Sequence, residues 1–269
     1  MPSTESHTAA RALTKQQLQI LTTLYKFRFA TASLLASSQG AKHTRVILTR
    51  LKILVDQGLI GQNYDKSYKL IGKPATYYLL PKGIRVLRQQ PFATENVLKR
   101  IYYDKNQNDV HIAHRLNVFR VYLFIKQNFP NQFQFYSKTE LSGRKYIPRD
   151  LTDAYLKRYV GIANKPNTRN PNVPVLSAKH YFLSYYEASS KTWRINNSIR
   201  RYIAYAESEK WQAAIKQQFP TVLLVCEDKK LKHKVQRIAD QYLQDSWADV
   251  RFIAFTLSKQ VASFLKQNS

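Results

Sequence analysis

Apolar side chains recur at helical spacing in the first part of the chain, which predicts three helices. The first runs from Thr14, a candidate N-cap, to about Phe27, and a short second one begins near Thr31. The third spans residues 41–58, where Gly58 is placed to end it. Its inward stripe consists of Ile47, Leu51, Leu54 and Val55. Three helices this close together, the last one basic, are typical of a helix-turn-helix.

Two short apolar runs with a basic stretch between them follow the third helix. Residues 62–64 and 76–80 have strand character, and residues 66–73 form the basic loop that joins them. A strand, loop and strand placed after a helix-turn-helix predict a wing. Pro81 then begins a short closing helix, so residues 1–95 are predicted to form a winged-helix domain.

The rest of the chain, residues 96–269, alternates helices with strands. Helices are predicted over residues 108–129, 196–218 and 229–243, and strands over 133–136, 154–156, 180–187, 221–226 and 250–255. This alternation predicts a mixed α/β sheet. Residues 165–174 contain three prolines in ten positions and are expected to form an exposed loop.

The charge balance indicates a polyanionic partner. The chain of 269 residues holds 43 Lys and Arg against 17 Asp and Glu, a net charge of +26. Between residues 6 and 94 there are fourteen basic residues and two acidic ones, Asp56 and Asp65. An ordinary surface mixes both signs. We therefore expect this part of the chain to face nucleic acid.

A single cysteine, Cys226, excludes a disulfide framework and a cysteine-based zinc cluster, and it is expected to serve packing. No apolar run approaches the roughly 20 residues of a membrane span. These features predict a cytoplasmic, nucleoid- or plasmid-associated protein that needs no membrane.

The third helix and the wing carry the residue types that contact duplex DNA. A recognition helix places its N-terminal residues against base edges, and lysines of a wing neutralise phosphates. The predicted contacts are Lys42, His43, Thr44, Arg45, Thr49 and Lys52 on the helix, and Lys66, Lys69 and Lys73 in the wing. The alternative is a solvated helix face. No acid lies between Ser6 and Val55 to pair these bases, which favours DNA contact, whereas Arg50 is as well placed to brace the fold.

Three stretches, residues 13–31, 44–60 and 73–83, resemble the winged helix of replication-relaxation proteins. That family occurs on plasmids and mobile elements and is linked by name to replication initiation and DNA relaxation. The resemblance implies a fold of the α+β and α/β classes, in which an N-terminal winged helix-turn-helix precedes a restriction-endonuclease-like α/β domain similar to PD-(D/E)XK nucleases.

In those nucleases an Asp after a proline-containing turn, an acidic strand and a lysine-bearing helix gather a divalent metal. Here Asp153 resembles the first element, and Asp150 is a nearby substitute. Ser184 and Tyr186 stand where the strand needs acids, and Ser198 stands where the helix needs its lysine.

Only Glu187 remains on that strand, so two of the three expected groups are missing. Metal-assisted phosphodiester cleavage needs carboxylates to hold the cation. The resemblance therefore implies an inactive nuclease-like domain without a cofactor, and a divalent metal enters only if the domain is active after all. Asp153, Glu187 and Lys191 are the catalytic candidates in that case.

The remaining groups of residues that could bind or react are weaker signals. His111 and His114 share one helix face, which could bind a metal, but further ligands are missing and a satisfied surface or core pair is favoured. Trp193, Trp211 and Trp247 fall near helix ends and are expected in the core. Residues 165–169, with Arg194, Arg200 and Arg201, predict either a second DNA surface or a solvated insertion.

Together these patterns predict a sequence-preferring double-stranded DNA-binding protein. The resemblance implies that it serves as a replication, relaxation or mobilisation accessory factor of a plasmid or mobile element. Its expected partners are duplex DNA, replication or relaxosome proteins, and a second copy in a homodimer. Two alternatives stay open, a metal-dependent DNA nuclease or nickase and a winged-helix transcriptional repressor.

Overall fold

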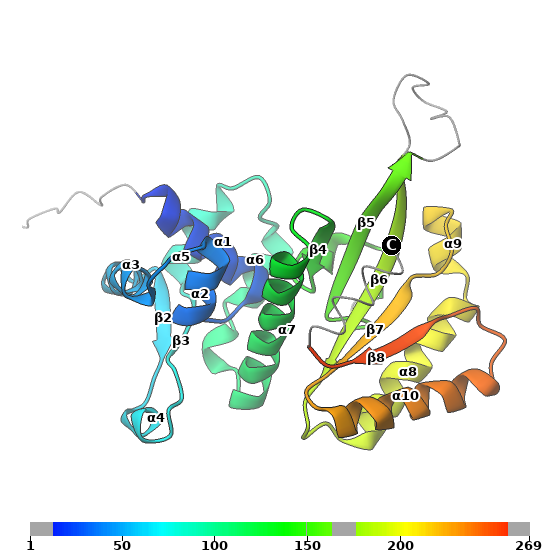
Figure 1. The fold of residues 1–269 in the computed structure, drawn as a ribbon. Coiled ribbons are helices and arrows are strands. Elements are labelled where there is room, and N and C mark those ends of the chain that lie inside the picture. Colours follow the sequence, from blue (N-terminus) through cyan, green and yellow to red (C-terminus); the bar gives the residue numbers. More distant parts are fainter. Residues whose placement is uncertain (1–12, 149, 163–175, 258–269) are drawn as a thin grey trace, which may run out of the picture. The chain divides into compact units, whose positions relative to one another are not determined.

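A computed structural model describes residues 13–148, 150–162 and 176–257, shown in Figure 1. The chain divides into two compact units, residues 1–106 and 107–269. Both combine helices with a sheet, so the fold belongs to the mixed α and β class that the sequence predicts. The predicted loop at residues 165–174 lies outside the described residues.

The first unit consists of three helices, an antiparallel sheet and a C-terminal helical segment. Its elements are α1 (Lys15–Phe27), β1 (Ala30–Thr31), α2 (Ala32–Gln39), α3 (Thr44–Asp56), β2 (Ile60–Asn63), α4 (Lys66–Leu70), β3 (Thr76–Leu79), α5 (Pro81–Arg88), α6 (Glu95–Ile101) and the 3₁₀ helix η1 (Asp104–Asn106). The sheet order is β1-β3-β2. The three predicted helices and the two strands of the predicted wing are confirmed, whereas α4 forms inside the stretch predicted as a loop.

Local side-chain bonds explain where the first helices begin. The Thr14 hydroxyl accepts a hydrogen bond from the Gln17 amide at 3.3 Å, and the Gln17 side chain accepts one from the Thr14 amide at 2.9 Å. This reciprocal capping box satisfies two amides that a helix end leaves without partners. At α2 the cap is a single bond, in which the Thr31 hydroxyl accepts from the Leu34 amide. Helix α3 buries Ile47, Leu51 and Leu54, as predicted. Val55, the fourth residue of the predicted stripe, is only half-buried.

Strands β2 and β3 form a hairpin whose base is fixed to α5. Ile60 pairs with Leu79 in antiparallel register, and the Leu80 amide donates to the Leu59 carbonyl at 3.0 Å. At Gly83 in α5, a Cβ atom would lie 2.2 Å from that same carbonyl oxygen. Only glycine allows α5 to approach the backbone this closely. The β2–β3 hairpin, residues 60–79, therefore leaves the body of the unit from a tightly packed base.

A buried ion pair binds η1 to the end of α1. Arg28 caps α1 in a left-handed conformation with φ of 74°. Its guanidinium donates to both carboxylate oxygens of Asp104, at 2.7 and 2.5 Å, and to the Arg100 carbonyl at 2.9 Å. Asp104 is 2% exposed. This pair connects η1 to the end of α1, and residues 95–106 lie within the first unit.

The second unit is built on a five-stranded mixed sheet. Its elements are α7 (Asp109–Asn128), β4 (Phe133–Ser137), the 3₁₀ helix η2 (Glu140–Gly143), β5 (Ala154–Ile162), β6 (Leu176–Tyr186), α8 (Thr192–Glu207), α9 (Lys210–Ile215), β7 (Thr221–Cys226), α10 (Lys229–Gln244) and β8 (Phe252–Phe255). The sheet order is β4-β5-β6-β7-β8, antiparallel from β4 to β6 and parallel from β6 to β8. The mixed sheet is as predicted, but the single helix expected over 196–218 is two helices, separated where Glu209 adopts a φ of 51°.

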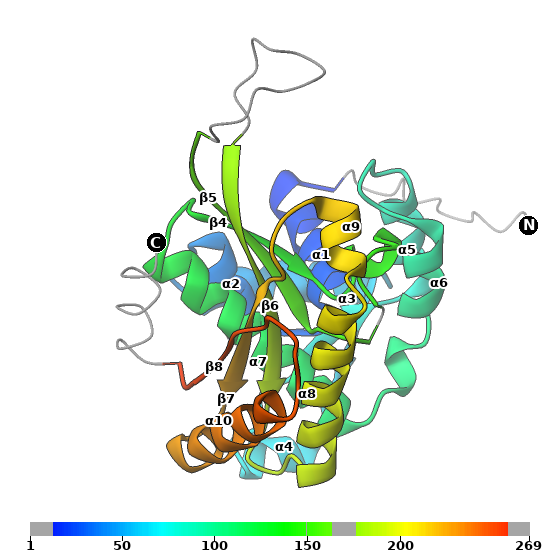
Figure 2. The ribbon, with the colours of Figure 1, turned by 90° about the vertical axis from the view of Figure 1, so that its right-hand side faces the viewer.

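Helices cover both faces of this sheet. Figure 1 shows α7 on one side and α8 and α10 on the other, and α8 lies in front of the sheet in Figure 2. Phe182, Val222 and Leu224 point to the α8 and α10 side, where they pack with Tyr202 and Trp211 in one apolar cluster. The alternate residues of the strands point the other way because successive strand side chains face opposite sides. Cys226 is buried in this core with a free thiol, as predicted.

Candidate nucleic-acid interface and a pocket in the second unit

The outer face of α3 carries the residues predicted to contact DNA. All six of these residues are exposed: Lys42, His43, Thr44, Arg45, Thr49 and Lys52. They are displayed because α3 buries the opposite stripe of Ile47, Leu51 and Leu54. Three aliphatic residues share the exposed face, and the sequence analysis did not single them out: Val46, Leu48 and Ile53. The face is therefore basic with apolar positions between the charges.

One of the predicted DNA contacts, Lys52, forms an ion pair that was not expected. The Lys52 ammonium lies 2.9 Å from the Asp56 carboxylate one helical turn later, and both side chains are exposed. Such a pair contributes only about 0.3–0.5 kcal/mol in water. For Lys42, His43 and Arg45, no ion pair is found with any described residue. The cationic groups of Lys42 and Arg45 therefore face solvent without an acidic partner in the described part of the chain.

The N-terminus of α3 opens into a basic pocket of about 500 Å³ between α1 and α3. Lys15, Lys42 and Arg50 line it. His43 occupies the N-cap position of α3, but its side chain makes no capping hydrogen bond to the first amides of the helix. Uncapped amides and nearby cations suit an anion. Arg50 donates to the Gln39 side chain at 3.2 Å, which is the bracing role considered for it.

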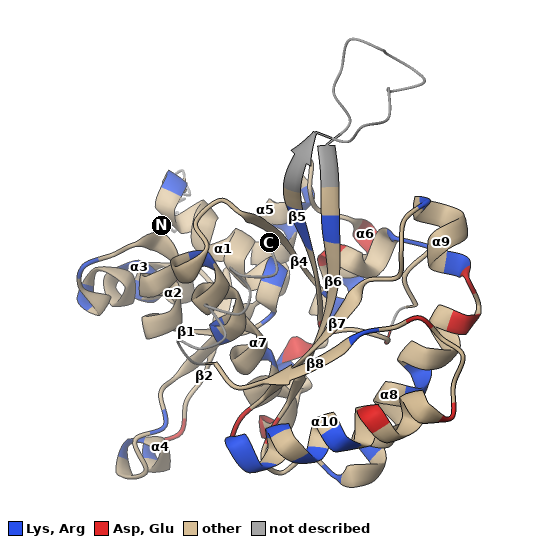
Figure 3. Ribbon diagram, turned by 45° about the vertical axis from the view of Figure 1, so that its right-hand side comes forward, with Lys and Arg blue, Asp and Glu red and all other residues tan. Residues whose placement is uncertain are grey.

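The β2–β3 hairpin carries the second predicted basic group. Lys66 and Lys69 are exposed on α4, and the Lys73 ammonium lies 4.1 Å from the centre of the Tyr68 ring. Figure 3 shows basic positions on the ribbon of α4. The one acid there, Asp65, caps α4, and hydrogen bonds from Ser67 lower its carboxyl pKa. Lys73 therefore packs along an aromatic ring, while Lys66 and Lys69 extend into solvent.

Two aliphatic side chains at the end of this hairpin were missed by the sequence analysis. Leu70 is 89% exposed and Ile71 is 73% exposed. The only sequence signal is their position, since two adjacent aliphatic residues interrupt an otherwise basic stretch.

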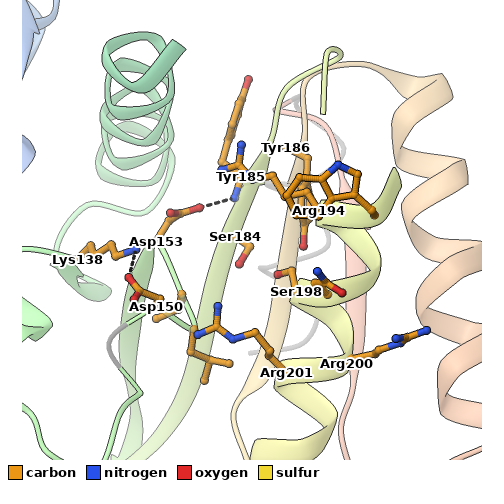
Figure 4. A pocket seen from close by; sticks show the side chains of 14 residues that line it. Lys138, Asp150, Asp153, Ser184, Tyr185, Tyr186, Arg194, Ser198, Arg200 and Arg201 are labelled. Atoms are coloured by element: carbon orange, nitrogen blue, oxygen red, sulfur yellow. Dashed lines mark hydrogen bonds and ion pairs between the residues drawn. The ribbon is translucent and has the colours of Figure 1, made fainter. Parts of the chain in front are cut away.

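In the second unit, the positions that resemble nuclease motifs surround one pocket of about 430 Å³, shown in Figure 4. These positions are Asp150, Asp153, Ser184, Tyr186 and Ser198. Four cations line the same pocket: Lys138, Arg194, Arg200 and Arg201. Lys191, a further candidate, is the residue before α8 and does not line the pocket.

A histidine of α7 joins the two acids that were candidates for catalysis. His114 Nε2 lies 3.0 Å from Asp153 Oδ1, and Nδ1 lies 2.6 Å from Glu187 Oε1. The other Asp153 oxygen accepts a hydrogen bond from the Tyr185 amide at 2.9 Å. The side chains of all three residues are at most 16% exposed. We call His114, Asp153 and Glu187 the acid–histidine cluster.

Burial and the neighbouring charges shift the pKa values in this cluster in opposite directions, and the effect of the charges is the larger one. Burial lowers the pKa of His114, but the two carboxylates raise it to about 9. Burial raises the pKa of Asp153, but His114 brings it well below its usual range. The pKa of Glu187 is lowered in the same way. At neutral pH the cluster is therefore an imidazolium between two carboxylates.

The imidazolium occupies the space between the two acids. Among the described residues, no group of three or more His, Cys, Asp and Glu side chains is arranged to hold a metal ion. The cluster was not predicted from sequence, where His114 was grouped with His111. In the structure His111 faces Arg115 on its own helix, and His114 reaches the ends of β5 and β6.

Two tryptophans also differ from expectation. Trp211 is fully buried as predicted, but Trp193 is 62% exposed and Trp247 is 73% exposed. Trp193 is the second residue of α8 and lines the pocket beside Arg194. The prediction was wrong because proximity to a helix end does not determine which way a side chain points.

Comparisons with known proteins identify the family. No described helix combines the length and the apolar character that crossing a membrane requires. The comparisons with curated proteins and with solved structures found no match. A model of the family described as Replication-relaxation matches residues 21–222, which include most of both units. This match spans well over half of the 269 residues, and the chain belongs to the replication-relaxation family.

Proposed function

We propose that the first unit is a winged helix that binds double-stranded DNA, with α3 in the major groove and the β2–β3 hairpin along the backbone. The observation that carries this proposal is the exposed face of α3, where Lys42, His43 and Arg45 have no ion pair with a described residue. A polyanion supplies the missing counter-charges.

The exposed face of α3 suits base recognition as well as charge neutralisation. The major groove admits an α-helix, and an arginine can donate two hydrogen bonds to one guanine. Arg45 lies in the first turn of α3, where recognition helices meet base edges. Val46 and Leu48 are exposed beside it and are of the apolar type that contacts thymine methyl groups.

Phosphate contacts have two sources in this proposal. The pocket at the start of α3 combines uncapped amides with Lys15 and Lys42, which suits one phosphate of the duplex. Lys66 and Lys69 project from α4 and reach the phosphates beside the groove. These contacts position the protein on the duplex, and Arg45 selects the sequence.

For the biological role, we propose a replication, relaxation or mobilisation accessory factor of a plasmid or mobile element. The support is membership of the replication-relaxation family. The nuclease alternative has no specific observation in its favour, because His114 lies between both candidate acids and bonds to each of them. A repressor would use the same α3 face, and a mapped binding site on replication or operator DNA distinguishes the two roles.

The test is duplex binding by fluorescence anisotropy over a salt series. Contact with six to ten phosphates lowers affinity by about 10³–10⁵ between ~50 and ~200 mM salt. The variant Lys42→Gln/Arg45→Gln should bind much more weakly than the control Lys99→Gln/Lys105→Gln, which makes the same charge change elsewhere in the unit. Equal losses in the two variants, or a response that is flat with salt, would overturn the proposal.

A further inference from the structure

We propose that the pocket at the start of α8 binds single-stranded DNA, with a backbone phosphate against Arg194 and Arg201 and an unpaired base stacked on Trp193. This site lies within the second unit and is separate from the α3 face. It goes beyond the duplex binding proposed above and does not depend on it.

The pocket has more positive charge than its own acids can neutralise. Four cations and two carboxylates line it, and each carboxylate already has a cationic partner. Lys138 lies 3.0 Å from Asp150, and His114 lies 3.0 Å from Asp153. For Arg194, Arg200 and Arg201, no ion pair is found with any described residue. Arg194 acts on Glu187 without a direct ion pair. An anion in the pocket would therefore meet guanidinium groups that are not held in direct ion pairs.

The arginines do not all face the same way. The Arg200 guanidinium lies 5.0 Å from the centre of the Tyr242 ring, and Figure 4 shows it directed away from Arg201. Arg201 extends toward the side of the pocket where Asp150 lies (Figure 4). A planar guanidinium can donate two parallel hydrogen bonds to a phosphate. Arg194 and Arg201 are therefore the residues that hold the phosphate.

The acid–histidine cluster removes an obstacle to anion binding. A free carboxylate at Asp153 would repel a phosphate in the same pocket. His114, which Asp153 shares with Glu187, offsets part of that charge, and the Tyr185 amide binds the second oxygen. Asn197 and Ser198 also line the pocket and offer neutral hydrogen-bond donors. The site therefore combines cations with polar donors, as phosphate sites do.

Trp193 favours a single strand over a duplex. Its indole is 62% exposed and lines the pocket next to Arg194. Proteins that bind single strands combine cationic grooves with exposed aromatic rings on which bases stack. Stacking requires the flat face of a base, which a base pair inside a duplex keeps covered. The pocket volume of about 430 Å³ also lies in the range of small-ligand sites, which suits a nucleotide.

The experiment uses the full chain with Trp247→Phe, so that Trp193 is the exposed member of the two remaining tryptophans. Single-stranded oligo-dT is added while tryptophan emission is recorded. We expect saturable quenching, because the base stacks on the Trp193 indole. A duplex of the same length binds the first unit and should leave this emission unchanged. Quenching by the duplex with equal affinity would overturn the single-strand assignment.

Two pairs of variants separate a specific site from general charge. Arg194→Gln/Arg201→Gln should weaken oligo-dT binding on the order of tenfold or more. The control Lys229→Gln/Lys230→Gln removes the same charge from the exposed start of α10 and should change affinity much less. Equal loss in both pairs would contradict the proposal. Trp211 emission, from the buried core, verifies that each variant is folded.

Two further measurements complete the test. Trp193→Ala, followed by anisotropy of labelled oligo-dT, should lose about tenfold in affinity, the size of one stacking contact. Thymidine monophosphate serves as competitor, and it should displace the oligomer only weakly. If the mononucleotide binds as tightly as the oligomer, the pocket is a nucleotide site and the proposal is wrong. Duplex binding by the α3 variants is measured separately, so failure here leaves that result unchanged.

Discussion

His114 Nδ1 lies 2.6 Å from Glu187 Oε1, and the opposite ring nitrogen contacts Asp153 at 3.0 Å. One side chain of α7 thus provides a single positive charge that is shared by two acids, one at the start of β5 and one at the end of β6. Charge-assisted hydrogen bonds of this kind are about twice as strong as neutral ones. Removing the histidine leaves two carboxylates with little access to water, which is strongly destabilising.

The first prediction concerns the pH dependence of stability. The pKa of His114 is about 9 in the folded chain, against an ordinary value of 6.5. Its contribution is therefore complete below about pH 6.5 and is lost as the pH rises toward 9, in total roughly 3 kcal/mol. The carboxyl pKa values of Asp153 and Glu187 are lowered, so their contribution is present above their ordinary values and is lost as the pH falls further. The optimum for this cluster lies between about pH 4.5 and 6.5.

Urea unfolding followed by tryptophan fluorescence measures this effect, since all three tryptophans lie in the second unit. The His114→Gln variant is the control. The stability difference between wild type and variant should shrink from pH 6 to pH 9, roughly as the imidazolium is lost. A difference that stays constant over this range would show that His114 does not carry the charge assigned to it.

The second prediction concerns nuclease activity. Supercoiled plasmid incubated with Mg²⁺ or Mn²⁺ should stay intact, because His114 occupies the space between the two acids that a metal would need. Agarose gels reveal nicked and linear products. Metal-dependent nicking that disappears in Asp153→Asn would restore the enzyme alternative.

The third prediction concerns base selection by Arg45. The variant Arg45→Ala should lose about 1–3 kcal/mol of binding to the preferred sequence and discriminate less between sequences. Sequencing of bound fragments selected from a random duplex pool identifies that sequence first. If affinity falls equally on all sequences, Arg45 contacts a phosphate and another residue reads the base.

The fourth prediction concerns the hairpin lysines. Lys66→Gln/Lys69→Gln should weaken binding to every duplex alike and reduce the slope of log affinity against log salt by about 2, since each phosphate contact contributes about 0.9. The exposed pair Lys99 and Lys105 provides the matched control. An unchanged slope would mean that the hairpin does not touch the duplex.

The fifth prediction concerns the Arg28–Asp104 pair. Asp104→Asn leaves the guanidinium of Arg28, which is 15% exposed, without its counter-charge, and should cost about 3–5 kcal/mol. Hydrogen exchange at the amides of α1 and α6 measures the loss. Replacing both partners with apolar residues, Arg28→Met/Asp104→Leu, should recover much of it. Fast exchange in the double variant as well would indicate that the hydrogen bond to the Arg100 carbonyl is the more important contact.

Sequence reasoning worked where local chemistry determines structure. Thr14 and Gln17 cap α1 through bonds three residues apart, and apolar spacing identified the buried stripe of α3. The continuous apolar run 221–226 likewise marked strand β7. Each of these signals lies within one element, so the sequence contains it in full.

Long-range pairings escaped prediction. His114 meets Glu187 across 73 residues, and Arg28 meets Asp104 across 76. Contacts between residues so far apart in the sequence produce no periodic pattern from which they could be predicted. The break before α9 was missed because Glu209 adopts a left-handed conformation that its residue type does not signal. The exposed cations of α3 and α4 could be predicted from the sequence. The pocket of the second unit could not, because it forms only when the fold brings β5, β6 and α8 together.

The close approach of Gly83 to the Leu59 carbonyl has a mechanical consequence for the hairpin. The base of the hairpin is held by α5 and by the pairing of Ile60 with Leu79, so this end of the hairpin has little freedom to move. In the proposed complex with duplex DNA, adjustment to different groove widths would then fall to the segment from Tyr64 to Ala75. Insertions or deletions in this segment would lengthen or shorten the hairpin without disturbing the packing at its base.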